Sequence, residues 1–588
     1  MKRRSFIKGA LLTTAAAASG GPFILTTRKS GAQTAPPVIP PSPPTQPWVE
    51  ELPAAITPLS TASLSPTPSI VANIAGGEIG RADHQRFADL TVPGKAGSPL
   101  HYEMHAKENP YWRFNPAYPQ QPIWGFSGQT GDATTPGPTL FARYGQSIIV
   151  RIYNDLPDPH VGFGTPEIST HLHNLHTPSE SDGFPGDFYS VNKAGPTLTH
   201  SGHFKDHFYP NVYAGLDTFN GIGDAREALG TLWYHDHTMD FTAPNVYRGL
   251  AGFYLIFDRL DSGNERDPDP GALRLPSHPF DYPIILSDKR FDSNGRLFFD
   301  QFAPEGILGD KITVNGKIEP VLHVQRRKYR FRFLNGGPSR FYEIYLQNKG
   351  ANTVYTFTYI ANDGNLLPGP MLNQTKVRLG VAERGDIVVD FSRFPLGTEL
   401  YFVNQLLQTD TRGPGNVKGP GTRLLKIMVD SNPDPNYPDM SRVPSVLRQL
   451  PTIPSNVATL PTTRRWEFAR SGGLWTVNNQ LFNVNVVRAA IPQGTAEIWE
   501  LVNPENGWQH PVHIHFEEGR IIGKSVAGVN VSVPVHERGR KDVYVLGKDE
   551  TLRVYLRFRD FTGKYPMHCH NLIHEDHAMM VRWDITPS

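Results

Sequence analysis

The stretch HCHNLIHEDHAMM (residues 568–580) contains Cys569, the only cysteine among the 588 residues of the chain. A single cysteine cannot form an intramolecular disulfide, so Cys569 is a buried apolar residue, a reactive thiol or a metal ligand. Histidines flank it directly on both sides, and His574 follows five residues after it. Because imidazole and thiolate are both ligands for transition metals, the pattern favours the third interpretation.

Three further histidine clusters precede this one in the chain. Together the four clusters hold ten of the 22 histidines: His171 and His173; His235 and His237; His510, His513 and His515; His568, His570 and His574. In an extended strand, residues i and i+2 point to the same face, so each HxH pair can direct two imidazoles at one metal cluster. One such pair is weak evidence, but four pairs are not explained by exposed or core histidines.

Strand alternation also explains the position of the thiol. If His568 and His570 face one way, Cys569 faces the other way and can bind a different metal. Cys569, His574 and a distant histidine then form a trigonal site, with Met579 as a weak axial ligand, which is the blue-copper arrangement. Zinc is the competing metal, but zinc does not transfer electrons, so a zinc site would gain nothing from a covalent link to further histidines.

The remainder of the chain predicts an all-β protein of sandwich domains. The sequence has 54 glycines, 54 prolines and 11% aromatic residues, and short Val/Ile/Tyr/Phe runs recur between turn residues. We expect a first domain at residues 48–260, a second at 275–430 and a third at 460–588. The histidine clusters fall in the first and third domains, and the second has no paired histidines.

The N-terminus predicts an export signal rather than part of the fold. Arg3 and Arg4 precede a short, Ala-rich apolar run, which is typical of a twin-arginine signal, with cleavage after Ala32. An ordinary secretory signal or a short anchor is the alternative. Residues 33–47 are rich in proline and predict an extended linker. We therefore expect export by the twin-arginine machinery to the periplasm or the medium.

The charge balance excludes two classes of partner. The 57 Lys and Arg residues against 56 Asp and Glu residues give a net charge of +1, so electrostatics offers no case for nucleic acid or a membrane surface. After the N-terminus, no segment approaches 18 consecutive apolar residues, so membrane insertion is not expected. The expected oligomeric state is a monomer.

The four histidine motifs, in this order, resemble those of the multicopper oxidases. The stretches LWYHDHTM, NVYRGLAGFYLI, VNGKIEP, RKYRFRFLN and HEDHAMM are similar to the branch that contains bacterial spore-coat laccases and bilirubin oxidases. The resemblance covers roughly residues 90–588 and fills every expected ligand position. It implies three cupredoxin-like domains with the Greek-key β-sandwich fold, and four coppers per chain.

The resemblance also implies which residues bind each copper. The type 1 copper takes His510, Cys569 and His574, with Met579 as the axial ligand. The type 2 copper takes His171 and His513, and the type 3 pair takes His173, His235, His237, His515, His568 and His570. The cluster of three coppers is then expected between the first and third domains, with four histidines from each.

The expected reaction is the four-electron reduction of dioxygen to water, driven by one-electron oxidation of a donor. The donor is expected at an exposed edge of His510, and its electrons pass through Cys569 to His568 and His570. Met579 favours a moderate potential, so easily oxidised phenols or aminophenols are the expected donors. By family position, Asp182 and Glu575 are the expected proton donors to the cluster; a turn-capping role is the alternative for Asp182.

Other functions remain open on the same scaffold. The physiological donor could be a metal ion such as Mn(II) or Cu(I), or bilirubin or o-aminophenol. From a different class, some exported proteins of this fold have lost copper and serve as cell-division scaffolds. Retention of all ten histidines, Cys569 and Met579 disfavours that scaffold function.

Overall fold

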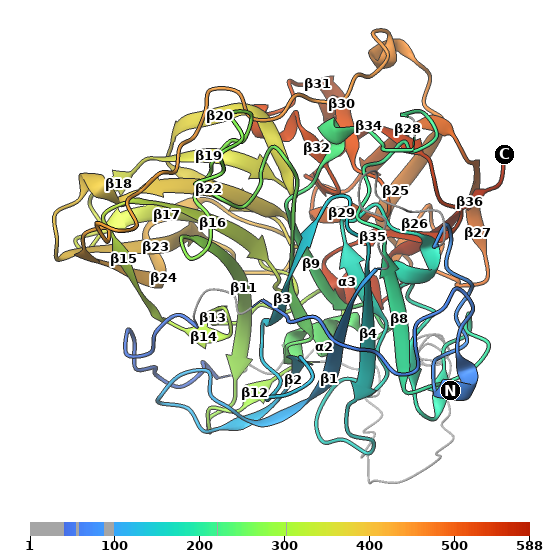
Figure 1. The fold of residues 1–588 in the computed structure, drawn as a ribbon, viewed down its shortest axis with the longest axis horizontal. Coiled ribbons are helices and arrows are strands. Elements are labelled where there is room, and N and C mark those ends of the chain that lie inside the picture. Colours follow the sequence, from blue (N-terminus) through green and yellow to red (C-terminus); the bar gives the residue numbers. More distant parts are fainter. Residues whose placement is uncertain (1–39, 54–57, 88–98, 220, 301–302) are drawn as a thin grey trace. The chain divides into compact units, whose positions relative to one another are not determined.

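The structure is a computed structural model that describes residues 40–53, 58–87, 99–219, 221–300 and 303–588 (Figure 1). Residues Ser42–Ser588 form one compact unit. The predicted signal peptide (residues 1–32) and residues 33–39 of the predicted linker lie outside the described residues, so both stay predictions. No helix within the described ranges has the length and apolar character needed to cross a membrane.

Strands make up nearly all of the regular secondary structure of the described chain, which confirms the all-β prediction. Six large sheets are built from three consecutive groups of strands, which run from blue to red along the chain in Figure 1. We refer to the groups β1–β10, β11–β24 and β25–β36 as the N-terminal, middle and C-terminal sandwiches. The described α-helices are short: α2 (Thr242–Arg248) and α3 (Leu572–Asp576).

The N-terminal sandwich consists of two four-stranded sheets and a small hairpin of β6 (Tyr189–Ser190) and β7 (Lys193–Ala194). Its first sheet has the order β2 (Gln121–Ser127), β1 (Leu100–Trp112), β4 (Ile148–Asp155), β8 (Phe204–Tyr209). Its second sheet has the order β3 (Gly137–Arg143), β10 (Ala251–Phe257), β9 (Thr231–Asp236), β5 (Thr170–His173). In β1 the buried residues Tyr102, Met104 and Ala106 alternate with more exposed ones, as expected for a strand with one face on a core.

The middle sandwich has an eight-stranded and a six-stranded sheet. The first has the order β14 (Lys317–Ile318), β13 (Lys311–Val314), β11 (Asp281–Phe291), β16 (Lys328–Asn335), β22 (Arg384–Asp390), β19 (Phe357–Asn362), β20 (Asn365–Gln374), with β12 (Leu297–Phe298) paired to β11. The second has the order β15 (Val321–Gln325), β24 (Val417–Ser431), β23 (Thr398–Leu406), β17 (Tyr342–Asn348), β18 (Val354–Tyr355), with β21 (Lys376–Leu379) paired to β17.

The C-terminal sandwich has a seven-stranded and a five-stranded sheet. The first has the order β26 (Leu474–Val477), β25 (Arg464–Ser471), β28 (Thr495–Asn503), β34 (Glu550–Phe558), β30 (Gly519–Val526), β31 (Val529–Asn530), with β32 (Arg540–Lys541) paired to β30. The second has the order β27 (Val487–Pro492), β36 (Met580–Thr586), β35 (Gly563–Cys569), β29 (His510–Ile514), β33 (Val543–Leu546).

Each sandwich encloses its own apolar core, drawn from both of its sheets. A further buried cluster joins the three sandwiches, because it combines Trp233 of β9, Leu334 of β16, Val543 of β33 and Leu572 of α3. Apolar burial therefore holds the three sandwiches together beside β9, one of the histidine-bearing strands. The domain boundaries at residues 48–260, 275–430 and 460–588 stay predictions.

The segment before the N-terminal sandwich pairs with the middle sandwich. Its backbone is extended, but Trp48 N donates to Glu319 O (2.8 Å) and Leu52 N donates to Val321 O (2.7 Å). The Leu52 side chain enters the core of the middle sandwich. The segment thereby satisfies backbone groups at the edge of the middle sandwich, next to and at the start of β15.

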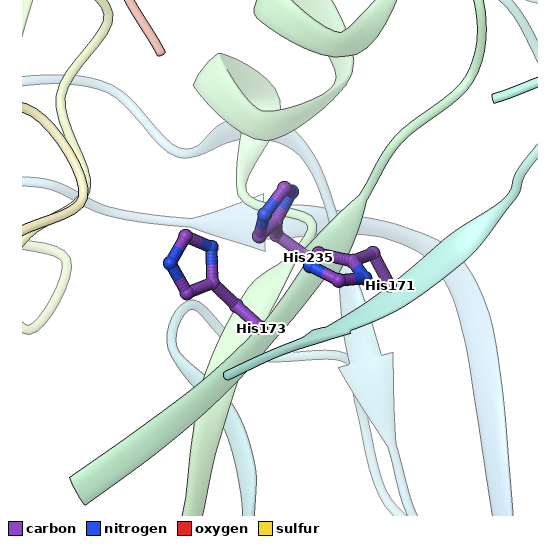
Figure 2. Close-up of side chains that lie close together, drawn as sticks. All are labelled: His171, His173 and His235. Atoms are coloured by element: carbon purple, nitrogen blue, oxygen red, sulfur yellow. The ribbon is translucent and has the colours of Figure 1, made fainter. Parts of the chain in front are cut away.

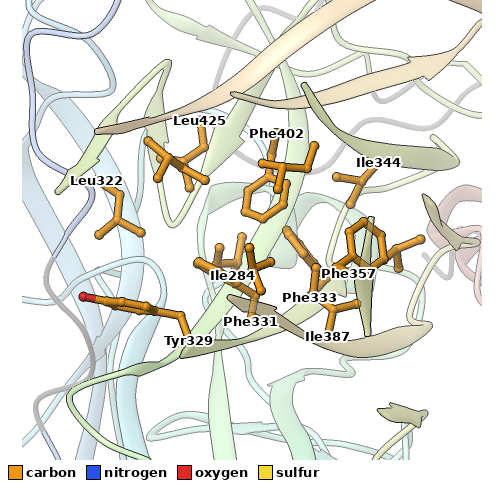
Figure 3. Packing of buried hydrophobic residues seen from close by; sticks show 14 of the residues in the cluster. Ile284, Leu322, Tyr329, Phe331, Phe333, Ile344, Phe357, Ile387, Phe402 and Leu425 are labelled. Atoms are coloured by element: carbon orange, nitrogen blue, oxygen red, sulfur yellow. The ribbon is translucent and has the colours of Figure 1, made fainter. Parts of the chain in front are cut away.

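The core of the middle sandwich carries a stability prediction (Figure 3). Phe331 is fully buried and lies 5.1 Å from Phe402, ring centroid to ring centroid. Phe331→Ala should lower the free energy of unfolding by about 3–5 kcal/mol, because it removes buried area and leaves a cavity. The exposed Leu372 on β20 supplies the control, and Leu372→Ala should change the free energy of unfolding by about 0.5 kcal/mol or less. Urea unfolding followed by fluorescence measures both, and equal effects would contradict the assigned core.

Candidate metal centres

Two pairs of neighbouring strands position the histidine motifs. In the N-terminal sandwich β5 pairs with β9, and His171 lies opposite His235. In the C-terminal sandwich β29 pairs with β35, and His513 lies opposite His568. Since side chains directly opposite each other in a sheet share a face, each strand pair gathers its HxH imidazoles on one side.

The two strand pairs bring eight imidazoles together at the contact between the N-terminal and C-terminal sandwiches. These residues are His171, His173, His235, His237, His513, His515, His568 and His570, and each is at most 1% exposed. Figure 2 shows three of them, His171, His173 and His235, with their rings gathered beside β5 and β9. We call these eight residues the histidine cluster.

Ring nitrogens from the two sandwiches face each other in the histidine cluster. The Nε2 atoms of His237 and His568 are 3.1 Å apart, and those of His171 and His513 are 3.4 Å apart. His515 Nε2 lies 3.2 Å from His568 Nε2. The ligand atoms of His237, His515 and His568 all lie within 4.8 Å of one another, as do those of His171, His513 and His515. Such convergence of lone pairs suits a cation between them.

The protonation chemistry of the cluster fits a metal. Burial lowers the pKa of His235 and of His237 to about 3, so both rings are neutral at ordinary pH. Among the described residues, His235 Nε2 and both ring nitrogens of His570 have no hydrogen-bond partner. Buried polar atoms are rarely left unpaired, and neutral imidazole is the form that binds transition metals. The residues therefore fit a cluster of metal ions.

Glu575 orients two of the cluster imidazoles. Its Oε2 lies 2.9 Å from His568 Nδ1 and its Oε1 lies 3.4 Å from His237 Nδ1. An Nδ1–H that points at a carboxylate leaves the Nε2 lone pair free for a metal. Burial opposes ionisation of Glu575, but His568 and His237 hold its pKa below the ordinary value.

Asp182 contacts two other imidazoles of the histidine cluster. Its Oδ2 lies 2.7 Å from His515 Nδ1, and its backbone carbonyl accepts from His171 Nδ1. Burial raises the pKa of Asp182 well above its ordinary value. The pKa values of Glu575 and Asp182 are thus shifted in opposite directions. This suits a pair in which one carboxyl group holds a proton and the other is ionised.

The thiol of Cys569 faces away from the histidine cluster. Its Sγ lies 3.5 Å from His510 Nδ1 and 3.7 Å from His574 Nδ1, and all three residues are fully buried. Burial raises the pKa of the Cys569 thiol and lowers the pKa of His510 to about 3. A thiolate and neutral imidazoles can coexist here only if a cation compensates the buried negative charge.

Met579 lies beside this thiol site. Its side chain is fully buried in the same apolar core as Cys569, and its carbonyl accepts from Cys569 N (3.0 Å). Met579 N in turn donates to His574 O (3.0 Å). The two backbone hydrogen bonds tie the methionine to both neighbouring residues of the thiol site.

One expectation about the thiol site is wrong. His510 was expected to present an exposed edge to the donor, but it is fully buried. The loop between β23 and β24 of the middle sandwich covers the residues that precede His510, since Gln509 N donates to Arg412 O (2.9 Å). The Arg412 guanidinium also lies 5.2 Å from the centroid of the Trp508 ring. Trp508 itself packs in the C-terminal core at 5% exposure.

The middle sandwich also contacts His574. This contact was not predicted from the sequence. His574 Nε2 lies 3.2 Å from the carbonyl oxygen of Glu305, and Trp475 stacks on the His574 ring at 3.7 Å between centroids. Donation of Nε2–H to Glu305 O leaves the Nδ1 lone pair facing Cys569. No motif marks a backbone carbonyl, so no sequence signal could have found Glu305.

Comparisons with known proteins agree with this geometry. Residues 452–588 match the family model described as multicopper oxidase. A bilirubin oxidase from Albifimbria verrucaria is 36% identical over 77% of this chain and 72% of its own length. A laccase from Bacillus stratosphericus is 30% identical over 86% of this chain and 98% of its own length.

The chain belongs to the multicopper oxidases. It is a laccase-like oxidoreductase, and membership of the family implies copper. The multicopper oxidase McoA from Aquifex aeolicus has the same fold, with a TM-score of 0.65, 24% identity, and coverage of 83% of this chain and 96% of its own. The predicted cupredoxin-like fold class is thereby confirmed.

The contacts of Glu575 predict a selective loss of turnover. Glu575→Gln removes the carboxylate that faces His568 and His237, so kcat should fall by about 100-fold or more while the blue absorbance stays. Glu497→Gln is the matched control, because Glu497 is a buried carboxylate of the C-terminal sandwich that pairs with Arg464 (2.7 Å). Steady-state kinetics and an absorption spectrum measure both variants. Loss of the blue colour in Glu575→Gln would assign Glu575 a structural role instead.

The thiol site predicts a different loss. A hydroxyl is a poor ligand for copper of this kind, so Cys569→Ser should lose the blue charge-transfer band and about one copper per chain. The histidine cluster faces the other way and should keep its metal. Copper analysis and absorption spectroscopy measure the result, and a blue Cys569→Ser protein would refute the assignment.

Proposed function

We propose that this multicopper oxidase holds four coppers, with one at the thiol site and three in the histidine cluster. The type 1 copper would take His510, Cys569 and His574, with Met579 as the axial ligand. The type 2 copper would take His171 and His513, and the type 3 pair would take His173, His235, His237, His515, His568 and His570. The observation that carries the proposal is the position of Cys569 Sγ, 3.5 Å from His510 Nδ1, while His568 Nε2 faces His237 at 3.1 Å.

Copper bound in these sites supplies one-electron oxidation of a donor and four-electron reduction of dioxygen to water. The peptide bonds of Cys569 link the thiol site covalently to His568 and His570, and they give electrons a short bonded route between the two sites. Glu575 and Asp182 hold and release protons beside the histidine cluster. Its eight imidazoles and both carboxyl groups are buried, which keeps bulk water away from the reacting oxygen.

The side chains around the thiol site support phenolic or aminophenolic donors. Trp475 stacks on His574 and contacts His510, and Trp508 contacts Trp475 and His574, so the surroundings of the thiol site are aromatic. The Arg412 guanidinium lies 5.2 Å from the centroid of the Trp508 ring, whereas the charge of the nearby Arg470 is balanced by Glu305 (3.2 Å). The positive charge of Arg412 repels a metal cation such as Mn(II) or Cu(I) and tolerates an organic donor, including one with carboxylates such as bilirubin.

We infer export to the periplasm or the medium by the twin-arginine route, in the monomeric state, from the sequence of the N-terminus. A cell-division scaffold without copper is disfavoured, because the orphaned buried nitrogens of the histidine cluster would be costly in a protein that binds no metal.

Copper analysis with an absorption spectrum tests the copper proposal. We expect about four coppers per chain, the blue band of a thiolate-bound copper and the near-ultraviolet shoulder of a type 3 pair. A colourless protein after copper loading would overturn the proposal.

Parallel steady-state assays test the donor proposal. We expect kcat/KM for a simple phenol, o-aminophenol and bilirubin to exceed that for Mn(II) and Cu(I) by at least about 10-fold, equivalent to about 1.4 kcal/mol in transition-state binding. A preference for either metal ion would mean that the organic donor class is wrong.

A further inference from the structure

A buried carboxylate that the copper assignment does not use touches two of the cluster histidines. Asp542 lies between β32 and β33 and is 1% exposed. Its Oδ2 lies 3.0 Å from His173 Nε2, and its backbone carbonyl lies 2.9 Å from His513 Nδ1. Asp542 therefore reaches one histidine from the N-terminal sandwich and one from the C-terminal sandwich.

These two contacts select opposite tautomers. A neutral imidazole carries one N–H, so a ring that donates from one nitrogen offers its lone pair on the other. Donation from His513 Nδ1 to Asp542 O leaves the lone pair on Nε2, which faces His171 Nε2 at 3.4 Å. The Asp542 carboxylate lies 3.0 Å from His173 Nε2, and its negative charge favours the proton on that nitrogen and the lone pair on Nδ1. Neither ring nitrogen of His173 has a hydrogen-bond partner among the described residues.

Asp542 is itself held by the middle sandwich. Arg384 of β22 donates from Nη1 to Oδ1 (2.9 Å) and from Nη2 to Oδ2 (3.0 Å) of Asp542. Arg384 Nη1 also donates to Ala382 O (2.9 Å), and both charged residues are buried. A bidentate guanidinium fixes the plane of the carboxylate as well as its position.

We propose that Asp542, fixed by Arg384, is the positioning residue that makes His173 present Nδ1 to the metal and His513 present Nε2. This inference rests on the proposed function, since it concerns how the histidine cluster holds copper. It also gives the middle sandwich, which has no proposed copper ligand, a role at the cluster.

Direct binding of metal by Asp542 is the competing role. The ligand atoms of His173, His513 and Asp542 do lie within 4.8 Å of one another. However, both carboxylate oxygens accept hydrogen bonds from Arg384, whose buried positive charge neutralises the carboxylate and repels a cation. The geometry therefore favours a hydrogen-bond acceptor over a ligand.

Resistance to a chelator tests the proposal on the copper-loaded, full-length protein. Asp542→Ala removes the carboxylate that faces His173 Nε2, so the chelator concentration that removes half of the cluster copper should fall by about 10-fold to 100-fold. The near-ultraviolet shoulder should disappear with that copper, while the blue band of the thiol site persists. If Asp542→Ala does not fold, the same measurement on Arg384→Lys tests the proposal. A lysine cannot hold both carboxylate oxygens, so we expect a smaller fall of the same kind.

Asp206→Ala is the matched control. Asp206 is a buried carboxylate of β8 that accepts two hydrogen bonds from Arg151 of β4 (2.7 and 2.8 Å), as Asp542 does from Arg384. Asp206→Ala should lower the thermal midpoint but keep the shoulder and the chelator resistance of the wild type. The proposal would be overturned if the chelator removed copper from the Asp542 or Arg384 variant no more easily than from this control. A wild-type protein without about four coppers or without the shoulder would instead overturn the proposed function.

Discussion

Successive side chains of a β-strand point to opposite faces, and this constraint determines where each metal-binding group of β35 lies. His568 and His570 turn toward the histidine cluster, and Cys569 between them turns into the C-terminal core toward His510 and His574. A thiol site and a histidine cluster thus become neighbours without any long-range arrangement of loops. The link between them is the covalent chain itself.

The other half of the histidine cluster comes from packing between sandwiches. His171 and His237 of the N-terminal sandwich meet His513 and His568 of the C-terminal sandwich through Nε2 atoms 3.1–3.4 Å apart. Apolar burial at Trp233, Leu334, Val543 and Leu572 holds the sandwiches together around this contact. The middle sandwich contributes polar groups in addition to Leu334: Glu305 O orients His574, and Arg384 fixes Asp542.

The sequence predicted the parts of the site that depend on local spacing. HxH alternation and the turn of Cys569 to the opposite face follow from strand geometry alone, whereas only the family resemblance assigned His510 to the thiol site. The structure brings the ten histidines together in two groups, eight in the histidine cluster and two at the thiol site. Contacts between sandwiches carry no comparable signal. A loop near Arg412, nearly 100 residues earlier in the chain, covers Gln509 and Trp508 next to His510, and the docking of Leu52 depends on the edge of β15. Asp542 occurs in an unremarkable KDV stretch, so its contact with His173 required the folded chain.

One thiol-bound copper, separate from the coppers of the histidine cluster, is the feature on which every assigned role depends. Anomalous diffraction at the copper edge, from crystals of the copper-loaded protein, locates each metal independently of activity. We expect one peak between Cys569, His510 and His574, and three further peaks among the eight cluster histidines. A copper bound jointly by Cys569 and a neighbouring His568 or His570, or no peak beside Cys569, would contradict the account.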